Sequence, residues 1–115
     1  MPMVRLTTNV EIGEAKKTEL LSALSKLVAK GIGKPERYVM AIAEGGSIII
    51  SGQPGPAAFA EVRSIGGLNA EANGRITSGL CSLLKERLAI SPERVYVNFL
   101  DIPAGDWGWN GETFG

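Results

Sequence analysis

The order of strand-like and helix-like segments constrains the fold of this chain more than any other feature of the sequence, because one pattern occurs twice. In each half, a strand-like segment precedes an amphipathic helical segment, and a second strand-like run follows the helix. The tripeptide Pro35-Glu36-Arg37, between helix and strand in the first half, recurs as Pro92-Glu93-Arg94 in the second. Val4-Arg5 recurs as Val62-Arg63 at nearly the same spacing. We therefore predict a duplicated strand–helix–strand (βαβ) unit.

The predicted elements follow from hydrophobic spacing and from β-branched and aromatic content. The predicted strands are 3–8, 38–43, 57–65 and 94–102, of which 38–43 is expected to be buried, and the predicted helices are 15–30 and 70–88. Asn69 is the expected N-cap of the second helix. Ile48 to Ile50 form a further short apolar run, and the tail is expected to form a hairpin because Asn110-Gly111 suits a two-residue turn.

The connections between these elements define the fold class. Two right-handed crossovers would place both helices on one face of a four-stranded mixed sheet, an α/β (α+β) fold in one domain, residues 1–115. The last long strand is apolar on both faces, with Phe99 on one side and Leu100 and Ile102 on the other. Because such a face is rarely left to solvent, we expect homo-oligomerisation to cover it. Alternatively, Ile48 to Ile50 and the C-terminal hairpin cover it within one chain.

Composition argues against several classes of function. Twelve Lys and Arg residues balance twelve Asp and Glu residues, so the net charge does not favour nucleic acid or an anionic membrane as a partner. No apolar run approaches membrane-spanning length and no secretory signal is recognisable, so the expected location is cytoplasmic. The chain has no histidine and one cysteine, Cys81, whose position on an apolar helix face favours core packing. Neither a metal nor another cofactor is expected.

The absence of histidine makes the start of the chain a candidate site. Histidine is the side chain most often used for proton transfer near neutral pH, so a proton-transfer enzyme would need another base. Removal of Met1 would convert Pro2 into a terminal secondary amine at the start of an apolar strand. Burial and one nearby cation could lower the pKa of this amine by about two units, leaving most of it as free base at pH 7. Many chains, however, begin with Met-Pro without any catalytic role.

Other candidate residues have both a structural and a functional interpretation. Lys34 follows a helix end, where the helix dipole stabilises a cation for structural reasons alone. Tyr96 and Asn98 share a strand face, either as a polar ledge in a site or as solvent-facing positions. Three aromatic residues in the glycine-rich tail either pack together or line an apolar pocket. They are Trp107, Trp109 and Phe114.

Five motifs occur in order along the whole chain. They are Met1-Pro2-Met3, Gly33-Lys34-Pro35, Ser64-Ile65-Gly66, the run from Ser91 to Asn98, and the run from Gly108 to Phe114. Together they resemble the macrophage migration inhibitory factor (MIF) family of the tautomerase superfamily. The resemblance implies a homotrimer whose sheets line a central barrel. It also implies keto–enol tautomerase activity on small aromatic 2-oxo acids such as phenylpyruvate, with dopachrome-type compounds as further candidates.

The resemblance also implies roles for individual residues. Pro2 would be the catalytic base once the preceding methionine is removed. Lys34 and the backbone of Ile65 would hold the substrate carboxylate and neighbouring oxygens, and Lys34 would also disfavour a protonated Pro2. Asn98 and Tyr96 would come from the adjacent subunit, so that only the trimer would have a complete site. The apolar wall that receives the aromatic ring would consist of Tyr38, Trp107, Trp109 and Phe114.

The sequence departs from the family at several positions. Pro56 to Ala60 lacks the CxxC motif of members with thiol–disulfide activity, so none is expected. Glu11-Ile12-Gly13 lacks the basic residue expected in the first loop of the animal cytokines, which weighs against a receptor-type partner. The bulk of Trp107 and the replacement of an aromatic residue by Leu100 indicate a narrower pocket. The alternative functions are a cytokine-like binding or signalling trimer with vestigial activity and a ligand-binding scaffold that uses the aromatic tail.

Overall fold

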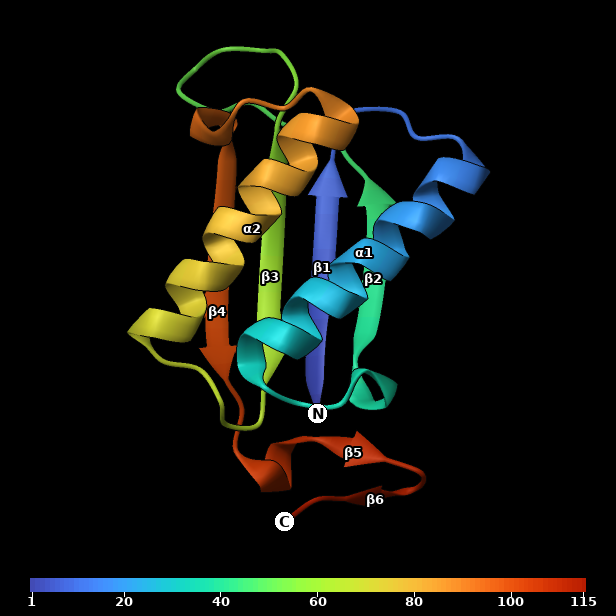
Figure 1. Ribbon diagram of the computed structural model, residues 1–115, viewed down its shortest axis with the longest axis vertical. Helices are drawn as coiled ribbons and strands as arrows, with labels where there is room; N and C mark the ends of the chain where they lie inside the picture. The colour runs from blue at the N-terminus through green and yellow to red at the C-terminus, as the bar shows by residue number, and fades with distance from the viewer.

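The two βαβ units form one four-stranded sheet with both helices on the same face, as a computed structural model of residues 1–115 shows (Figure 1). The predicted fold class is therefore confirmed. The main elements are β1 (Pro2–Thr8), α1 (Glu14–Ile32), β2 (Met40–Gly45), β3 (Ala58–Ser64), α2 (Ala70–Leu88) and β4 (Val95–Asp101). The remaining elements are the 3-10 helices η1 (Glu36–Tyr38), η2 (Pro92–Arg94) and η3 (Ala104–Asp106) and a hairpin of β5 (Gly108–Trp109) and β6 (Glu112–Thr113).

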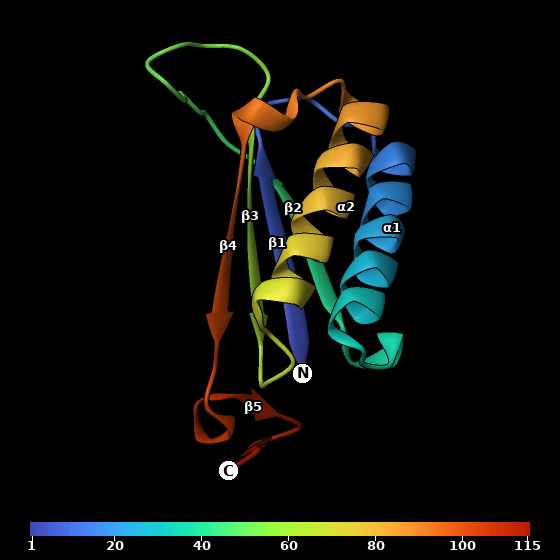
Figure 2. The same ribbon diagram turned by 60° about the vertical axis from the view of Figure 1, so that its left-hand side comes forward.

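The sheet is mixed, with the strand order β2-β1-β3-β4. Strands β1 and β2 are parallel, as are β3 and β4, whereas the antiparallel pairing of β1 with β3 joins the two units. The register places Pro2 opposite Ser64 and Ser64 opposite Asp101. These three residues therefore mark one end of the sheet, which we call the Pro2 end. The C-terminal hairpin also lies beyond this end (Figures 1 and 2).

The core lies between the sheet and the helices and uses alternate strand positions. Even-numbered positions of β1 and β3 are buried against the helices, whereas the odd-numbered positions face the open side of the sheet. Each helix contributes one stripe with a spacing of four residues, as an amphipathic helix requires. The fully buried helix residues of the core are Leu20, Leu24, Val28, Ile76, Leu80 and Leu84. Neither helix has the length and apolar character needed to cross a membrane.

Local signals set the helix ends and so position the loops of the site. Asn69 Oδ1 accepts a hydrogen bond from the Ala72 N–H at 2.8 Å, which confirms the predicted N-cap of α2. Helix α1 ends at Gly33, whose φ of 80° is the left-handed conformation typical of a C-terminal glycine. The N–H groups of Gly33 and Lys34 both donate to the Ala29 carbonyl. This cap brings Lys34 out of the helix at the Pro2 end.

One prediction about the middle of the chain was wrong. The strand predicted over 38–43 is present as β2, but it begins at Met40, after the 3-10 turn Glu36–Tyr38, and it is not buried. Strand β2 is at the sheet edge, where a side chain lacks a neighbour on one side, and Met40 is 60% exposed. The run Ile48 to Ile50 forms no strand and makes only a single bridge, from Ile50 to Gln53.

Neither segment proposed as an intramolecular cover shields the open face of the sheet. The loop containing Ile48 to Ile50 lies beyond one end of the sheet, and the hairpin lies beyond the other (Figure 2). On the open face of β4, Tyr96 is 66% exposed and Leu100 is 48% exposed. The alternative of cover within one chain is therefore wrong.

The open face also carries charges that the apolar pattern of β4 did not indicate. Arg5 Nη2 lies 2.8 Å from Glu61 Oε1, and Arg5 Nε lies 3.8 Å from Glu44 Oε1. Arg63 approaches the other carboxylate oxygen of Glu61 at 3.4 Å. A partner surface must therefore accommodate an ion-pair network as well as apolar side chains.

Substitution of two helix glycines by alanine should change the stability of the protein in opposite directions. A methyl group at Gly31 would overlap Cγ1 of the fully buried Ile76, whereas a methyl group at the exposed Gly74 would meet no atom. Overpacking costs about 1–3 kcal/mol, and alanine gains up to about 1 kcal/mol over glycine in a helix. We therefore expect Gly31→Ala to lower the free energy of unfolding by about 1 kcal/mol and Gly74→Ala to raise it by about 0.5–1 kcal/mol. Urea unfolding at one fixed protein concentration measures both, and equal shifts would contradict this packing.

Candidate active site

The first two residues of the chain pack against the rest of the fold. The Pro2 side chain is fully buried at the first position of β1, where a residue without an N–H is tolerated. The carbonyl oxygen of Met1 accepts a hydrogen bond from the Ile65 N–H at 3.3 Å. The connection from β3 to α2, which contains Ile65, therefore runs directly beside the N-terminus.

Lys34 completes this group from the first βαβ unit. Its Nζ donates a hydrogen bond to the Ile65 carbonyl oxygen, and no carboxylate forms an ion pair with it. The structure thus brings together Pro2, Lys34 and Ile65, which lie far apart in the sequence. Burial, and then the charge and hydrogen bonding of Lys34, lower the pKa of the Met1 terminal amine below its ordinary value. The start of the chain is therefore an environment that favours an uncharged amine.

The turn after β3 has partners that the sequence did not reveal. Gly66 and Gly67 have φ values of 73° and 80°, which side-chain-bearing residues rarely adopt. The Ser64 hydroxyl donates to the Gly66 carbonyl at 2.7 Å, and the Gly66 N–H donates to Asp101 Oδ1 at 2.9 Å. The two glycines signalled a turn, but only the pairing of β3 with β4 identifies Asp101 as its partner.

Tyr38 lies near the Pro2 end, because it is followed closely by Met40, which pairs with Met3. Its ring is partly exposed and is covered by Arg37, whose guanidinium carbon lies 4.6 Å from the ring centroid. Arg37 Nη2 also donates to the Tyr38 hydroxyl at 3.0 Å. Sequence reasoning placed Tyr38 in the site but gave no role to Arg37.

The aromatic tail forms the predicted hairpin. Asn110 and Gly111 have φ values of 53° and 85°, as the two-residue turn requires. The rings of Trp109 and Phe114 stack with centroids 6.2 Å apart and an interplanar angle of 7°, yet they are 61% and 41% exposed. Trp107 is half-buried and takes part through its carbonyl oxygen, which accepts the Phe114 N–H at 3.1 Å. The stacked pair is therefore available to a ligand or a neighbouring chain.

Tyr96 and Asn98 do not approach Pro2 within one chain. Both are exposed on the open face of β4, and β3 separates β4 from β1. The register sets Tyr96 level with Thr7, and Asn98 level with Arg5. With strands about 4.8 Å apart and a rise of about 3.3 Å per residue, Tyr96 lies about 19 Å and Asn98 about 14 Å from Pro2. A single chain therefore carries only part of the predicted site.

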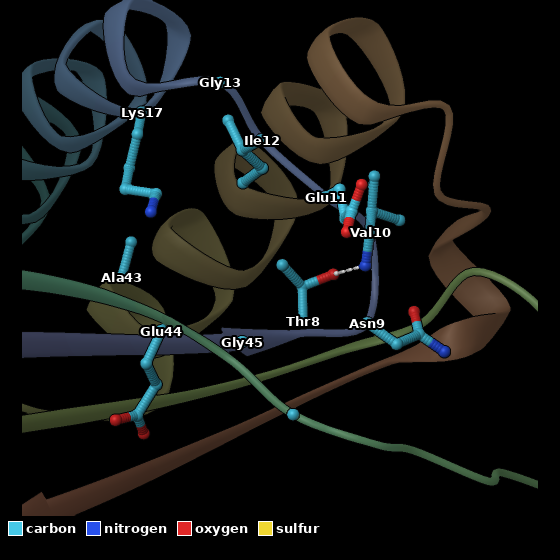
Figure 3. Close-up of a pocket in the computed structure, with 11 residues that line it drawn as sticks. Thr8, Asn9, Val10, Glu11, Ile12, Gly13, Lys17, Ala43, Glu44 and Gly45 are labelled. Carbon is cyan, nitrogen blue, oxygen red and sulfur yellow. Dashed lines mark hydrogen bonds between the residues drawn. The ribbon is translucent and has the colours of Figure 1, made fainter.

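A cavity of about 620 Å³ lies at the opposite end of the sheet and includes none of the predicted site residues. It is formed by the loop from Asn9 to Gly13, the end of β2, and Lys17 of α1 (Figure 3). Lys17 extends from α1 towards Ala43, and Thr8 Oγ1 accepts the Val10 N–H at 3.2 Å. No group of three His, Cys, Asp or Glu side chains in the protein could hold a metal ion.

Comparison with known proteins agrees with this architecture over the whole chain. The family model described as "Macrophage migration inhibitory factor (MIF)" matches residues 1–115. The macrophage migration inhibitory factor of Meriones unguiculatus is 37% identical over 115 residues, covering 99% of each chain. The MIF homologue from Prochlorococcus marinus superimposes with a TM-score of 0.91 at 34% identity, covering 98% of this chain and 99% of that one.

A more distant structure is that of Pt0534 inactivated by 2-oxo-3-pentynoate. It superimposes with a TM-score of 0.85 at 25% identity, covering 96% of this chain and 94% of that one. The full-length match to the family model, together with the fold and the similarity to its members, shows that this chain belongs to the macrophage migration inhibitory factor family.

Proposed function

We propose that this protein is a tautomerase that interconverts the keto and enol forms of small aromatic 2-oxo acids such as phenylpyruvate. The base would be the Pro2 amine after removal of Met1. The observation that carries this proposal is the hydrogen bond from the Ile65 N–H to the Met1 carbonyl oxygen, next to the Lys34 ammonium. Removing Met1 would free two groups together, the Pro2 nitrogen and the Ile65 N–H.

The freed groups have complementary chemistry. Lys34 supplies a positive charge and Ile65 a backbone donor, which together suit a carboxylate. Pro2 supplies a basic nitrogen, and the influences that lower the pKa of the Met1 amine would act on it from nearly the same position. An ordinary terminal amine has a pKa near 8, so a downward shift increases the fraction of free base at neutral pH.

The proposed step is a proton transfer at the carbon next to the keto group. The Pro2 nitrogen removes a proton from this carbon, the electron pair of the C–H bond forms the C=C bond, and the keto oxygen becomes an enolate that takes a proton from water. Pro2 then returns its extra proton to water. The Lys34 charge would stabilise the developing enolate. A positioned base of this kind contributes about 10² to 10⁴-fold.

The neighbouring aromatic side chains support an aromatic substrate. Tyr38 lies on the connection into β2, and the stacked, exposed Trp109 and Phe114 lie beyond the same end of the sheet (Figure 1). A wall of such rings would receive a phenyl group and exclude water from the reacting carbon. The inactivation of the similar protein Pt0534 by 2-oxo-3-pentynoate is consistent with a 2-oxo acid ligand.

A homotrimer would supply the missing part of the site. The open face of the sheet is uncovered, and the exposed Tyr96 and Asn98 lie far from Pro2 of their own chain. Symmetric association could bring Asn98 of one chain to Pro2 of the next. The substrate-binding role of Asn98 and Tyr96 depends on this assembly.

Blocking the N-terminus should abolish activity. A chain that retains Met1 has an amide at Pro2, with no basic lone pair, so we expect turnover of phenylpyruvate to fall by at least about 10²-fold relative to the chain that begins at Pro2. Intact mass distinguishes the two preparations. Pro2→Gly should also lose most activity, while the number of chains per particle, measured by native mass spectrometry, stays that of the wild type. Full turnover by the chain that retains Met1 would end the proposal.

Removing the Lys34 charge should change both binding and pH dependence. Loss of a charged hydrogen bond is expected to raise KM for a 2-oxo acid by roughly ten- to a hundredfold in Lys34→Gln. After burial, Lys34 is the next cause that lowers the pKa of the Met1 amine. Its charge would act on the Pro2 amine from nearly the same position, so its removal should raise the pKa of Pro2. The acidic limb of the kcat/KM profile should therefore move to higher pH. Lys30→Gln, on an exposed helix position, is the control and should leave KM and the profile unchanged.

A mixing experiment tests whether the site is shared between chains. Pro2→Gly and Asn98→Ala should each be weakly active alone. If Asn98 serves the Pro2 of an adjacent chain, refolding the two variants together in equal amounts should restore about one quarter of the sites, by random assembly of a closed ring. Native mass spectrometry should show three chains per particle. A mixture no more active than its components would place both residues in the same chain's site or show that Asn98 is not needed.

A further inference from the structure

The turn from Ile65 to Gly67 has an intrinsically permissive backbone. Gly66 and Gly67 both have positive φ, and glycine has more accessible conformations than any other residue. Both polar groups of Ile65 nevertheless have defined partners, since its N–H meets the Met1 carbonyl and its C=O meets Lys34. Contacts with other parts of the chain must therefore select this one conformation of the turn.

The contacts come from the ends of β3 and β4. The Asp101 carboxylate accepts the Gly66 N–H at 2.9 Å, and the Ser64 hydroxyl donates to the Gly66 carbonyl at 2.7 Å. The Ile102 N–H donates to the Ser64 carbonyl at 2.9 Å, which ties the two strand ends together. Both backbone polar groups of Gly66 are thus fixed. No cation forms an ion pair with Asp101, so the Asp101 side chain bonds only to the Gly66 N–H.

The same turn also contacts Lys34. A methyl group at Gly67 would lie 2.5 Å from Cγ2 of Ile32 and 3.6 Å from Cε of Lys34. The bare Gly67 backbone therefore packs against Ile32 at the end of α1, and the Lys34 side chain lies close to it. If the turn moved, the position of the Lys34 ammonium would change with it, because that ammonium is bonded to the Ile65 carbonyl.

We propose that Asp101 is a positioning residue, which, together with Ser64, fixes the Ile65–Gly67 turn so that the Ile65 N–H and the Lys34 ammonium converge on the substrate carboxylate. This inference rests on the proposed tautomerase function of the same site. Asp101 acts through the Gly66 N–H and takes no part in proton transfer. A carboxylate held equally in ground and transition states contributes to KM more than to kcat, so the effect should appear in KM.

Two variants of Asp101 separate its hydrogen bond from its charge. Asp101→Asn keeps an oxygen that can accept the Gly66 N–H, so KM should stay within about threefold of the wild type. Asp101→Ala removes the acceptor, and KM for phenylpyruvate should rise roughly tenfold or more while kcat changes less. The acidic limb of kcat/KM should also move to higher pH in Asp101→Ala, because Lys34 would no longer be held beside the amine. Asp106→Ala, at an exposed position whose side chain makes no hydrogen bond or ion pair, should change none of these quantities.

Exchange of the Gly66 amide provides a readout that does not depend on turnover. It should accelerate in Asp101→Ala and remain near wild type in Asp101→Asn, as measured by NMR on chains that begin at Pro2. If Asp101→Ala does not fold, Ser64→Ala removes the other contact with little change in volume and should raise KM in the same way. An unchanged Gly66 exchange rate, an unchanged KM, or equal effects of the Asn and Ala variants would overturn the proposal.

Binding of an unreactive carboxylate distinguishes failure of this inference from failure of the proposed function. Hydrocinnamate, which lacks the keto group, should shift the Ile65 amide signal of the wild type, and Asp101→Ala should need roughly tenfold more of it. If the wild type binds hydrocinnamate in this way but does not turn over phenylpyruvate, the tautomerase proposal fails and the positioning role stands. If Asp101→Ala binds hydrocinnamate as tightly as the wild type, the positioning role fails whatever the turnover.

Discussion

The antiparallel pairing of β1 with β3 is the interaction on which the rest of the structure depends. It is the only pairing that joins the two βαβ units in one sheet, and its register sets Pro2 opposite Ser64. The N-terminus therefore lies beside the turn that begins at Ile65, and the parallel partner β4 brings Asp101 to the same end. A shift of one residue would turn the buried Val4 and its alternate neighbours to the open face, so the core and the site require the same register.

The electrostatics of the site follow from an uncompensated cation. Elsewhere on the sheet, Arg5 and Arg63 are paired with Glu61. Lys34 has only a carbonyl partner, and after burial its charge is the next cause that lowers the pKa of the Met1 terminal amine. The start of the chain therefore favours an uncharged amine, in a protein that has no histidine.

The open face explains why a single chain carries only part of the predicted site. It combines exposed apolar side chains of β4 with the ion pairs around Glu61, so it is neither an ordinary solvent-facing surface nor a dry core. Residues such as Asn98 are displayed there, across two strand spacings from Pro2. Association of identical chains would bury the apolar part and keep the charges in a shared interior, which is compatible with sheets arranged around a central barrel.

Short-range patterns in the sequence determined much of this protein. The helical stripes, the Asn69 cap and the Asn110-Gly111 turn depend on residues within one or two turns of chain, so their structures followed from spacing and side-chain chemistry. The duplicated element order was sufficient to predict the mixed sheet with both helices on one face. The candidate role of Pro2 came from its position in the sequence and from the missing histidine.

Only the tertiary structure decided which distant groups meet. The exposure of β2 follows from its place at the sheet edge. The repeated Pro-Glu-Arg motif places its arginine in two different environments. Arg37 covers the Tyr38 ring, whereas Arg94 donates hydrogen bonds to carbonyl groups of the loop before β3. The Asp101 contact to Gly66 joins residues 35 positions apart. Such contacts depend on strand register and on the packing of loops against strand ends, which arise from the whole fold and leave no local pattern in the sequence.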